Sequence, residues 1–206
     1  GQRAELPEAA MVELREAVDD MVCSIGLPGG GVPFASDVAD AYLAGLDLDD
    51  VRPEDLPELL ERRMFAVPAV GTRIGDEEFP FLDPSDPDDR AMLIEGEHPQ
   101  YHDALADPHS GDVDGVNPRL HVAVHEIVAE QLWNDDPPQV WQAAKRLTAA
   151  GAERHDVLHA LGEVVARHLY GVLIGGGPSD VARYVEEMDA LGRVEDDRVV
   201  PLRRKR

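Results

Sequence analysis

Residues 117–133, NPRLHVAVHEIVAEQLW, decide the fold class that we predict for the whole chain. The segment opens with Asn117 and Pro118, and a capping side chain followed by proline is typical of a helix start. Apolar residues then recur three and four positions apart, which is the spacing of one face of an α-helix. The segment therefore predicts an amphipathic helix. Its apolar face is centred on Leu120, Val124, Ile127 and Val128.

The same helical periodicity runs along most of the chain on both sides of this segment. Stop signals such as Gly26-Leu27-Pro28 and Gly151 separate the apolar stretches. The pattern predicts an all-α fold, a helical bundle with a helical N-terminal extension. The predicted helices run from about Glu5 to Ile25, Ser36 to Leu46, Pro53 to Leu60, His98 to Leu105, Asn117 to Trp133, Pro138 to Gly151, Glu153 to Leu173 and Val181 to Leu191.

Residues 66–90 interrupt this helical pattern. Prolines and glycines break any helix here, and Asp83–Asp89 is an acidic, turn-forming run. The stretch Ala66–Ile74 admits a tight pair of strands. We expect the whole segment to be an irregular Pro/Gly/Asp-rich linker or a covering loop. The predicted organisation is a helical N-terminal segment at 1–65, the linker at 66–90, a histidine-rich bundle domain at 91–192 and a tail at 193–206.

Composition and charge exclude several classes of protein. Of the 206 residues 43% are hydrophobic, as in an ordinary globular domain, and the formal charge is −23. This charge repels phosphate backbones, so we expect no nucleic-acid partner. Cys23 is the single cysteine, which excludes an intrachain disulfide and a thiolate-rich zinc site. Without a long apolar stretch or a signal peptide, we expect no membrane partner and a cytoplasmic location. The substrate stays unknown, and a homo-oligomer stays open.

Six of the eight histidines form three pairs in which the two residues are four positions apart. Random placement of the histidines would give roughly 0.3 such pairs. On a helix this spacing puts both imidazoles of a pair on one face, and imidazole is the commonest metal ligand in proteins. The pattern therefore predicts a metal-binding protein. The pairs are His98/His102, His121/His125 and His155/His159.

The two later pairs lie at the flanks of apolar helix faces, which is where helical bundles build metal sites. Two imidazoles from each of two helices would supply four nitrogen ligands to a zinc-like ion. The small residues Gly162 and Ala166 would let another element approach closely. We expect a transition metal ion, with zinc or iron favoured, in a mononuclear or dinuclear site. The predicted ligands are His121, His125, His155 and His159, then Glu163, and then His102 and His98, which could complete a second ion.

This ligand set leaves two kinds of function open. An ion with an open coordination position could support hydrolysis or redox chemistry. Alternatively, the domain is a non-catalytic binding or scaffold module whose neutral histidines hydrogen-bond between helices and titrate near about pH 6. The chain carries no GxxxxGK[ST], GxGxxG or GxSxG motif. His121–Glu126 reads HxxxHE and lacks the internal glutamate of the zinc-peptidase HExxH motif. Whether the protein is an enzyme is left undecided.

Three stretches of the chain resemble a bacterial family described as domain of unknown function 1841. They are HPQYH at 98–102, NPRLHVAVH at 117–125, and EQL at 130–132 running to DPP at 136–138. The resemblance spans about residues 92–172. It implies an all-helical domain and offers no established activity. The histidines of these motifs coincide with the first two pairs described above.

Overall fold

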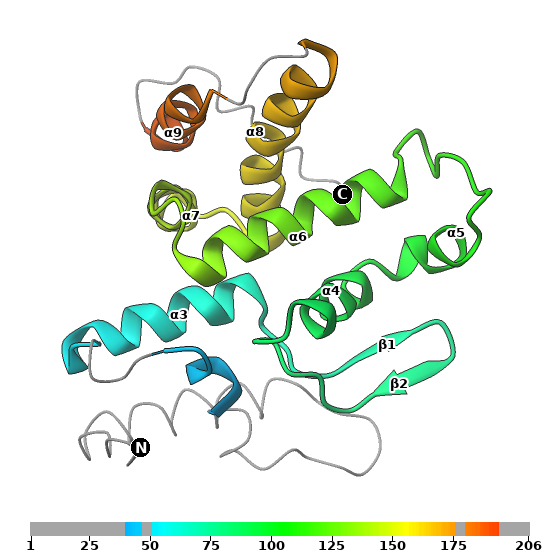
Figure 1. The fold of residues 1–206 in the computed structure, drawn as a ribbon, viewed down its shortest axis with the longest axis horizontal. Helices are drawn as coiled ribbons and strands as arrows, with labels where there is room; N and C mark the ends of the chain where they lie inside the picture. Colours follow the sequence, from blue (N-terminus) through cyan, green and yellow to red (C-terminus); the bar gives the residue numbers. More distant parts are fainter. Residues whose placement is uncertain (1–39, 47–50, 176–179, 194–206) are drawn as a thin grey trace. The chain divides into compact units, whose positions relative to one another are not determined.

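The computed structural model describes residues 40–46, 51–175 and 180–193. This part of the chain is predominantly helical and contains one two-stranded sheet (Figure 1), so the all-α prediction is confirmed. The predicted helix from Glu5 to Ile25 lies outside the described residues. Contacts divide the chain into two units, Gly1–Val122 and Ala123–Arg206, and the division lies inside one helix.

In the described part of the first unit, a buried arginine connects the first short helical elements. Residues 40–43 are helical, and a 3₁₀ turn η1 (Pro53–Asp55) leads into helix α3 (Leu56–Ala66). Arg63 of α3 donates hydrogen bonds from Nη1 to the carbonyls of Tyr42 (2.6 Å) and Ala44 (2.9 Å). These carbonyls end the short helix and need donors. Burial lowers the pKa of Arg63 to about 10, and the neighbouring charges of Arg62 and Arg90 act in the same direction.

The segment predicted as a linker holds a β-hairpin. Strands β1 (Thr72–Ile74) and β2 (Glu77–Phe79) pair antiparallel, and Gly75 begins their two-residue turn at a φ of 57°. The strand pair predicted around Ala66–Ile74 is therefore placed too early. The physical reason is the turn, because a two-residue hairpin turn needs a residue that tolerates a positive φ, which Gly75 supplies.

Helix α4 (Pro87–Gly96) follows the hairpin and packs against β1 (Figure 1). The Asp86 side chain caps α4 by accepting hydrogen bonds from the backbone N–H groups of Asp88 and Asp89. At its other end, a Cβ atom on Gly96 would lie 1.7 Å from Thr72 Oγ1, so only glycine lets the strand approach this closely. A 3₁₀ turn η2 (Pro99–Tyr101) and helix α5 (His102–Ala106) complete this region.

Helix α6 (Pro118–Asn134) matches the predicted helix to within one residue at each end. The cap is the one expected, because the Leu120 N–H donates to Asn117 Oδ1 at 3.0 Å. Leu120 itself was expected at the centre of the apolar face, and it is 56% exposed. In the first turn of α6, Pro118 rather than Leu120 is the buried residue. The buried residues of α6 are Pro118, Val122, Val124, His125, Val128, Ala129, Leu132 and Trp133.

The described residues of the second unit form three further helices that contact one another: α7 (Gln139–Ala149), α8 (Arg154–Gly175) and α9 (Val181–Ala190) (Figure 1). Their most buried residues recur three and four positions apart, as one face of a helix requires, and each large one contributes about 1.5–3 kcal/mol by burial. Arg146 of α7 donates to the carbonyls of Met188, Asp189 and Leu191, which end α9. In the described part of the chain, no helix is long and apolar enough to cross a membrane. The buried residues include Val140, Ala143, Ala144, Val157, Leu161, Val164 and Met188.

Candidate metal centre

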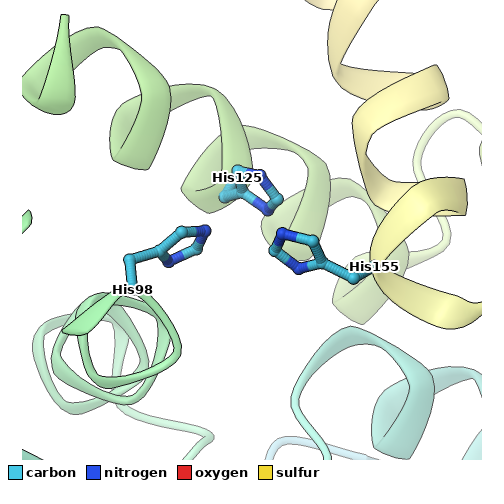
Figure 2. A group of neighbouring side chains, drawn as sticks. All are labelled: His98, His125 and His155. Atoms are coloured by element: carbon cyan, nitrogen blue, oxygen red, sulfur yellow. The ribbon is translucent and has the colours of Figure 1, made fainter. Parts of the chain in front are cut away.

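Three of the predicted ligands come together in the second unit. His125 lies on α6, and His155 and His159 lie one turn apart on α8. The ring centres of His125 and His155 are 5.3 Å apart, those of His125 and His159 are 5.0 Å apart, and those of His155 and His159 are 4.5 Å apart. Figure 2 shows the His125 ring extending from α6 and the His155 ring turned toward it from α8. We call these three residues the histidine triad.

The separations within the triad are those of imidazoles that share one ion. Nitrogen ligands lie at about 2.0–2.1 Å from zinc, which puts the ring centres of ligands at tetrahedral angles about 5 Å apart. A ring nitrogen of His125 lies within 4.8 Å of one of His155, and a ring nitrogen of His125 also lies within 4.8 Å of one of His159. Both α8 histidines therefore have a ring nitrogen close to the His125 ring.

A glycine on α8 explains how α6 comes close enough to complete the triad. A Cβ atom on Gly162 would lie 2.8 Å from Cγ1 of Val124. Val124 is the residue before His125, and Gly162 follows His159 by three positions. The expectation that a small residue at Gly162 permits a close approach is therefore confirmed.

The triad lies at the surface of the second unit. His125 is buried, with 5% of its surface exposed, whereas His155 and His159 are exposed. An ion bound here would be anchored by the buried ring and reached from solvent past the other two. The overall charge of −23 also favours the approach of a cation.

The first unit contains an aromatic cluster made of His98, Tyr101 and His121. The ring centres of His98 and His121 are 4.9 Å apart, and those of Tyr101 and His121 are 5.2 Å apart. His98 is 1% exposed, and its Nδ1 lies 2.8 Å from the carbonyl oxygen of Ile94. His121 is half-buried in the first turns of α6. His98 therefore meets His121, which is 23 positions away, rather than its sequence neighbour His102.

His102 has a different role, because backbone groups occupy both of its ring nitrogens. Its Nδ1 accepts a hydrogen bond from the Gly75 N–H at 3.0 Å, and its Nε2 donates to the Glu95 carbonyl at 3.1 Å. His98 precedes the 3₁₀ turn η2, and His102 begins α5. The four-residue spacing therefore does not lie on one continuous helix, which is the condition for putting both rings on one face.

Three other side chains of α8, including the predicted ligand Glu163, do not join either cluster. Glu163 is exposed on α8, and the groups of potential ligands in the described part of the chain contain only histidines. Tyr170 is 66% exposed. His168 lies with its Nε2 3.5 Å from Glu187 Oε2, and its ring makes an edge contact with the ring of Tyr184, so it interacts with neighbours from α9. Burial raises the pKa of the Tyr184 hydroxyl to about 12.

Comparison with known proteins gives one match. Residues 85–190 match a family whose description is Domain of unknown function (DUF1841). The match runs from just before α4 to the end of α9 and includes every histidine of the two clusters. No curated protein and no solved structure matches the chain. Because the matched range covers just over half of the 206 residues, the chain belongs to the DUF1841 family.

Proposed function

We propose that this protein binds a transition metal ion through the histidine triad, His125, His155 and His159. The observation that carries the proposal is the clustering of three imidazoles from two helices, with ring centres 4.5–5.3 Å apart. Imidazoles this close repel one another once they are protonated. A shared cation converts the same proximity into an attraction, because each neutral ring then donates a lone pair to it.

The imidazole nitrogen ligands favour a transition metal ion of intermediate softness. Neutral imidazoles suit zinc, iron, nickel and copper, whereas magnesium and calcium prefer oxygen ligands. A thiolate site is excluded by composition, since the chain has only Cys23. We favour zinc or iron, as the sequence predicts.

Three protein ligands leave at least one coordination position open. Structural zinc sites are usually closed by four protein ligands, whereas catalytic sites keep a position for water or substrate. The exposure of His155 and His159 supports the open type. An ion in this position supplies an activated water for hydrolysis or a site for redox chemistry. We propose one of these two reaction types, without assigning the substrate.

Metal analysis of protein without a histidine tag tests the proposal. Samples are loaded with zinc or, under nitrogen, with ferrous iron, dialysed exhaustively and analysed by mass spectrometry for metal per chain. We expect at least one ion per chain to survive dialysis of the wild type. Wild-type protein that retains neither metal overturns the proposal.

Matched variants assign the ion to the triad. His155→Gln and His159→Gln replace exposed rings, so we expect them to fold and to lose the tightly bound ion. The control is His109→Gln, which removes an exposed histidine from the loop before α6 and should leave binding unchanged. Retention of the ion by both triad variants contradicts the assignment.

A further inference from the structure

The protonation of His98 is fixed by the main chain. Its Nδ1 lies 2.8 Å from the Ile94 carbonyl oxygen, and a carbonyl only accepts hydrogen bonds. Nδ1 therefore carries the proton in the neutral ring, and the lone pair is on Nε2. Histidines that ligate metals are held in this way, with the second ring nitrogen donating to a backbone carbonyl or a carboxylate. His98 is thus oriented as a ligand is.

A second imidazole lies next to this oriented ring. The ring centres of His98 and His121 are 4.9 Å apart, and the ring planes cross at 78°. This separation matches the roughly 5 Å expected of two imidazoles on one ion. Both residues belong to the first unit, and Tyr101 covers the pair with its ring centre 5.2 Å from that of His121.

His102 provides an internal contrast. It lies only four positions after His98, but both of its ring nitrogens are hydrogen-bonded to backbone groups of Gly75 and Glu95. It has no lone pair to offer to an ion. Within this short segment, backbone groups bind both ring nitrogens of His102, whereas at His98 the Ile94 carbonyl binds Nδ1 and so orients the ring.

We propose that His98 and His121 form a second metal site, so that the chain binds two transition metal ions. The inference rests on the proposed function for the nature of the ion, and on the geometry of the first unit for the site. His121 and His125 lie one turn apart on α6, so this helix supplies a ligand to each site. With two protein ligands instead of three, the second site binds more weakly, and water or substrate fills its remaining positions.

Cobalt(II) titration of tag-free protein tests the second site. The visible absorption of cobalt counts the bound ions, and isothermal titration with zinc gives their affinities. We expect the wild type to bind two equivalents, the second more weakly than the first because it has one protein ligand fewer. His98→Gln should bind one equivalent with unchanged affinity for the tighter ion. His109→Gln is the control and should bind two.

A second variant keeps the test decisive if loss of the buried His98 ring prevents folding. His121→Gln changes a half-buried ring and should also remove only the weaker equivalent, with circular dichroism confirming the fold. A wild type that binds one equivalent, or a folded His98→Gln or His121→Gln that still binds two, overturns the second site. If the wild type binds one equivalent and His155→Gln binds none, the second site is overturned and the proposed function stands. If the wild type binds no metal, the second site and the proposed function are both overturned.

Discussion

Val124 of α6 packs directly over Gly162 of α8, so closely that a Cβ atom on the glycine would lie 2.8 Å from Val124 Cγ1. We predict that Gly162→Ala pushes the two helices apart and weakens ion binding by the triad about tenfold or more. Overpacking typically costs about 1–3 kcal/mol, which outweighs the roughly 1 kcal/mol that alanine gains over glycine in a helix. Urea unfolding measures the expected loss of stability, and zinc titration measures the expected loss of affinity for the ion.

Gly171 is the matched control for this prediction. It lies on the same helix, and nothing lies within 4 Å of a Cβ atom built on it. Gly171→Ala should therefore stabilise the protein by up to about 1 kcal/mol and leave ion binding unchanged. The double variant Gly162→Ala/Val124→Ala should recover ion binding relative to Gly162→Ala alone. Equal effects of the two glycine variants would contradict the role assigned to the close approach.

His102 should matter for stability and not for metal binding. His102→Ala removes a hydrogen bond to the Gly75 N–H in the hairpin turn and one to the Glu95 carbonyl of α4. Leaving such groups without their partner costs about 1–3 kcal/mol where water does not replace it. We expect a loss of this size in urea unfolding, compared with under about 0.5 kcal/mol for His109→Ala. If His102→Ala folds fully but no longer binds the ion, this division of roles is contradicted.

The helices could be predicted because their signals are local. The Asn117-Pro118 start, the helical spacing after it and the glycine stop at Gly151 are each written within a few residues, and the structure follows them. The hairpin lies later in the chain than predicted, because its position depends on which glycine makes the turn, and this segment contains many prolines and glycines that could do so. The exposure of Leu120 depends on what packs over the first turn of α6, which no local pattern specifies.

The candidate site was predictable only where two histidines share one continuous helix. His155 and His159 are such a pair, and α8 places their rings 4.5 Å apart. His98 and His102 have the same spacing, but a 3₁₀ turn separates them, so the spacing no longer puts both rings on one helix face. The pairing of His98 with His121 joins residues 23 positions apart, and it arises from packing rather than from any repeat in the sequence.

The cluster around Glu187 should contribute to stability in a pH-dependent way. Burial acts to raise the pKa of this carboxyl, but hydrogen bonds from Arg183 and Arg167 and the nearby His168 together hold it below its ordinary value. A group with a lowered pKa in the folded state stabilises the fold above its unfolded pKa, and this contribution disappears as the pH falls through the folded pKa. We therefore expect Glu187→Gln to lower the melting temperature at pH 7 and to have little effect at about pH 3. A difference that persists unchanged at acid pH would show that packing, not charge, explains the effect.

Acid and chelator distinguish a metal centre from hydrogen-bonded structural histidines. Ion binding requires unprotonated imidazoles, whose ordinary pKa is about 6.5, so the bound ion stabilises the fold above this pH and is released as the pH falls below it. We predict that the melting temperature at pH 7.5 drops on addition of a chelator and recovers with excess zinc. Below about pH 5 the chelator should have no further effect, because the ion has already left. In His155→Gln the chelator response at pH 7.5 should be lost, whereas His109→Gln should keep it. A wild type whose stability falls between pH 7 and 5.5 but ignores the chelator at pH 7.5 would instead assign the histidines to a scaffold that responds to protons.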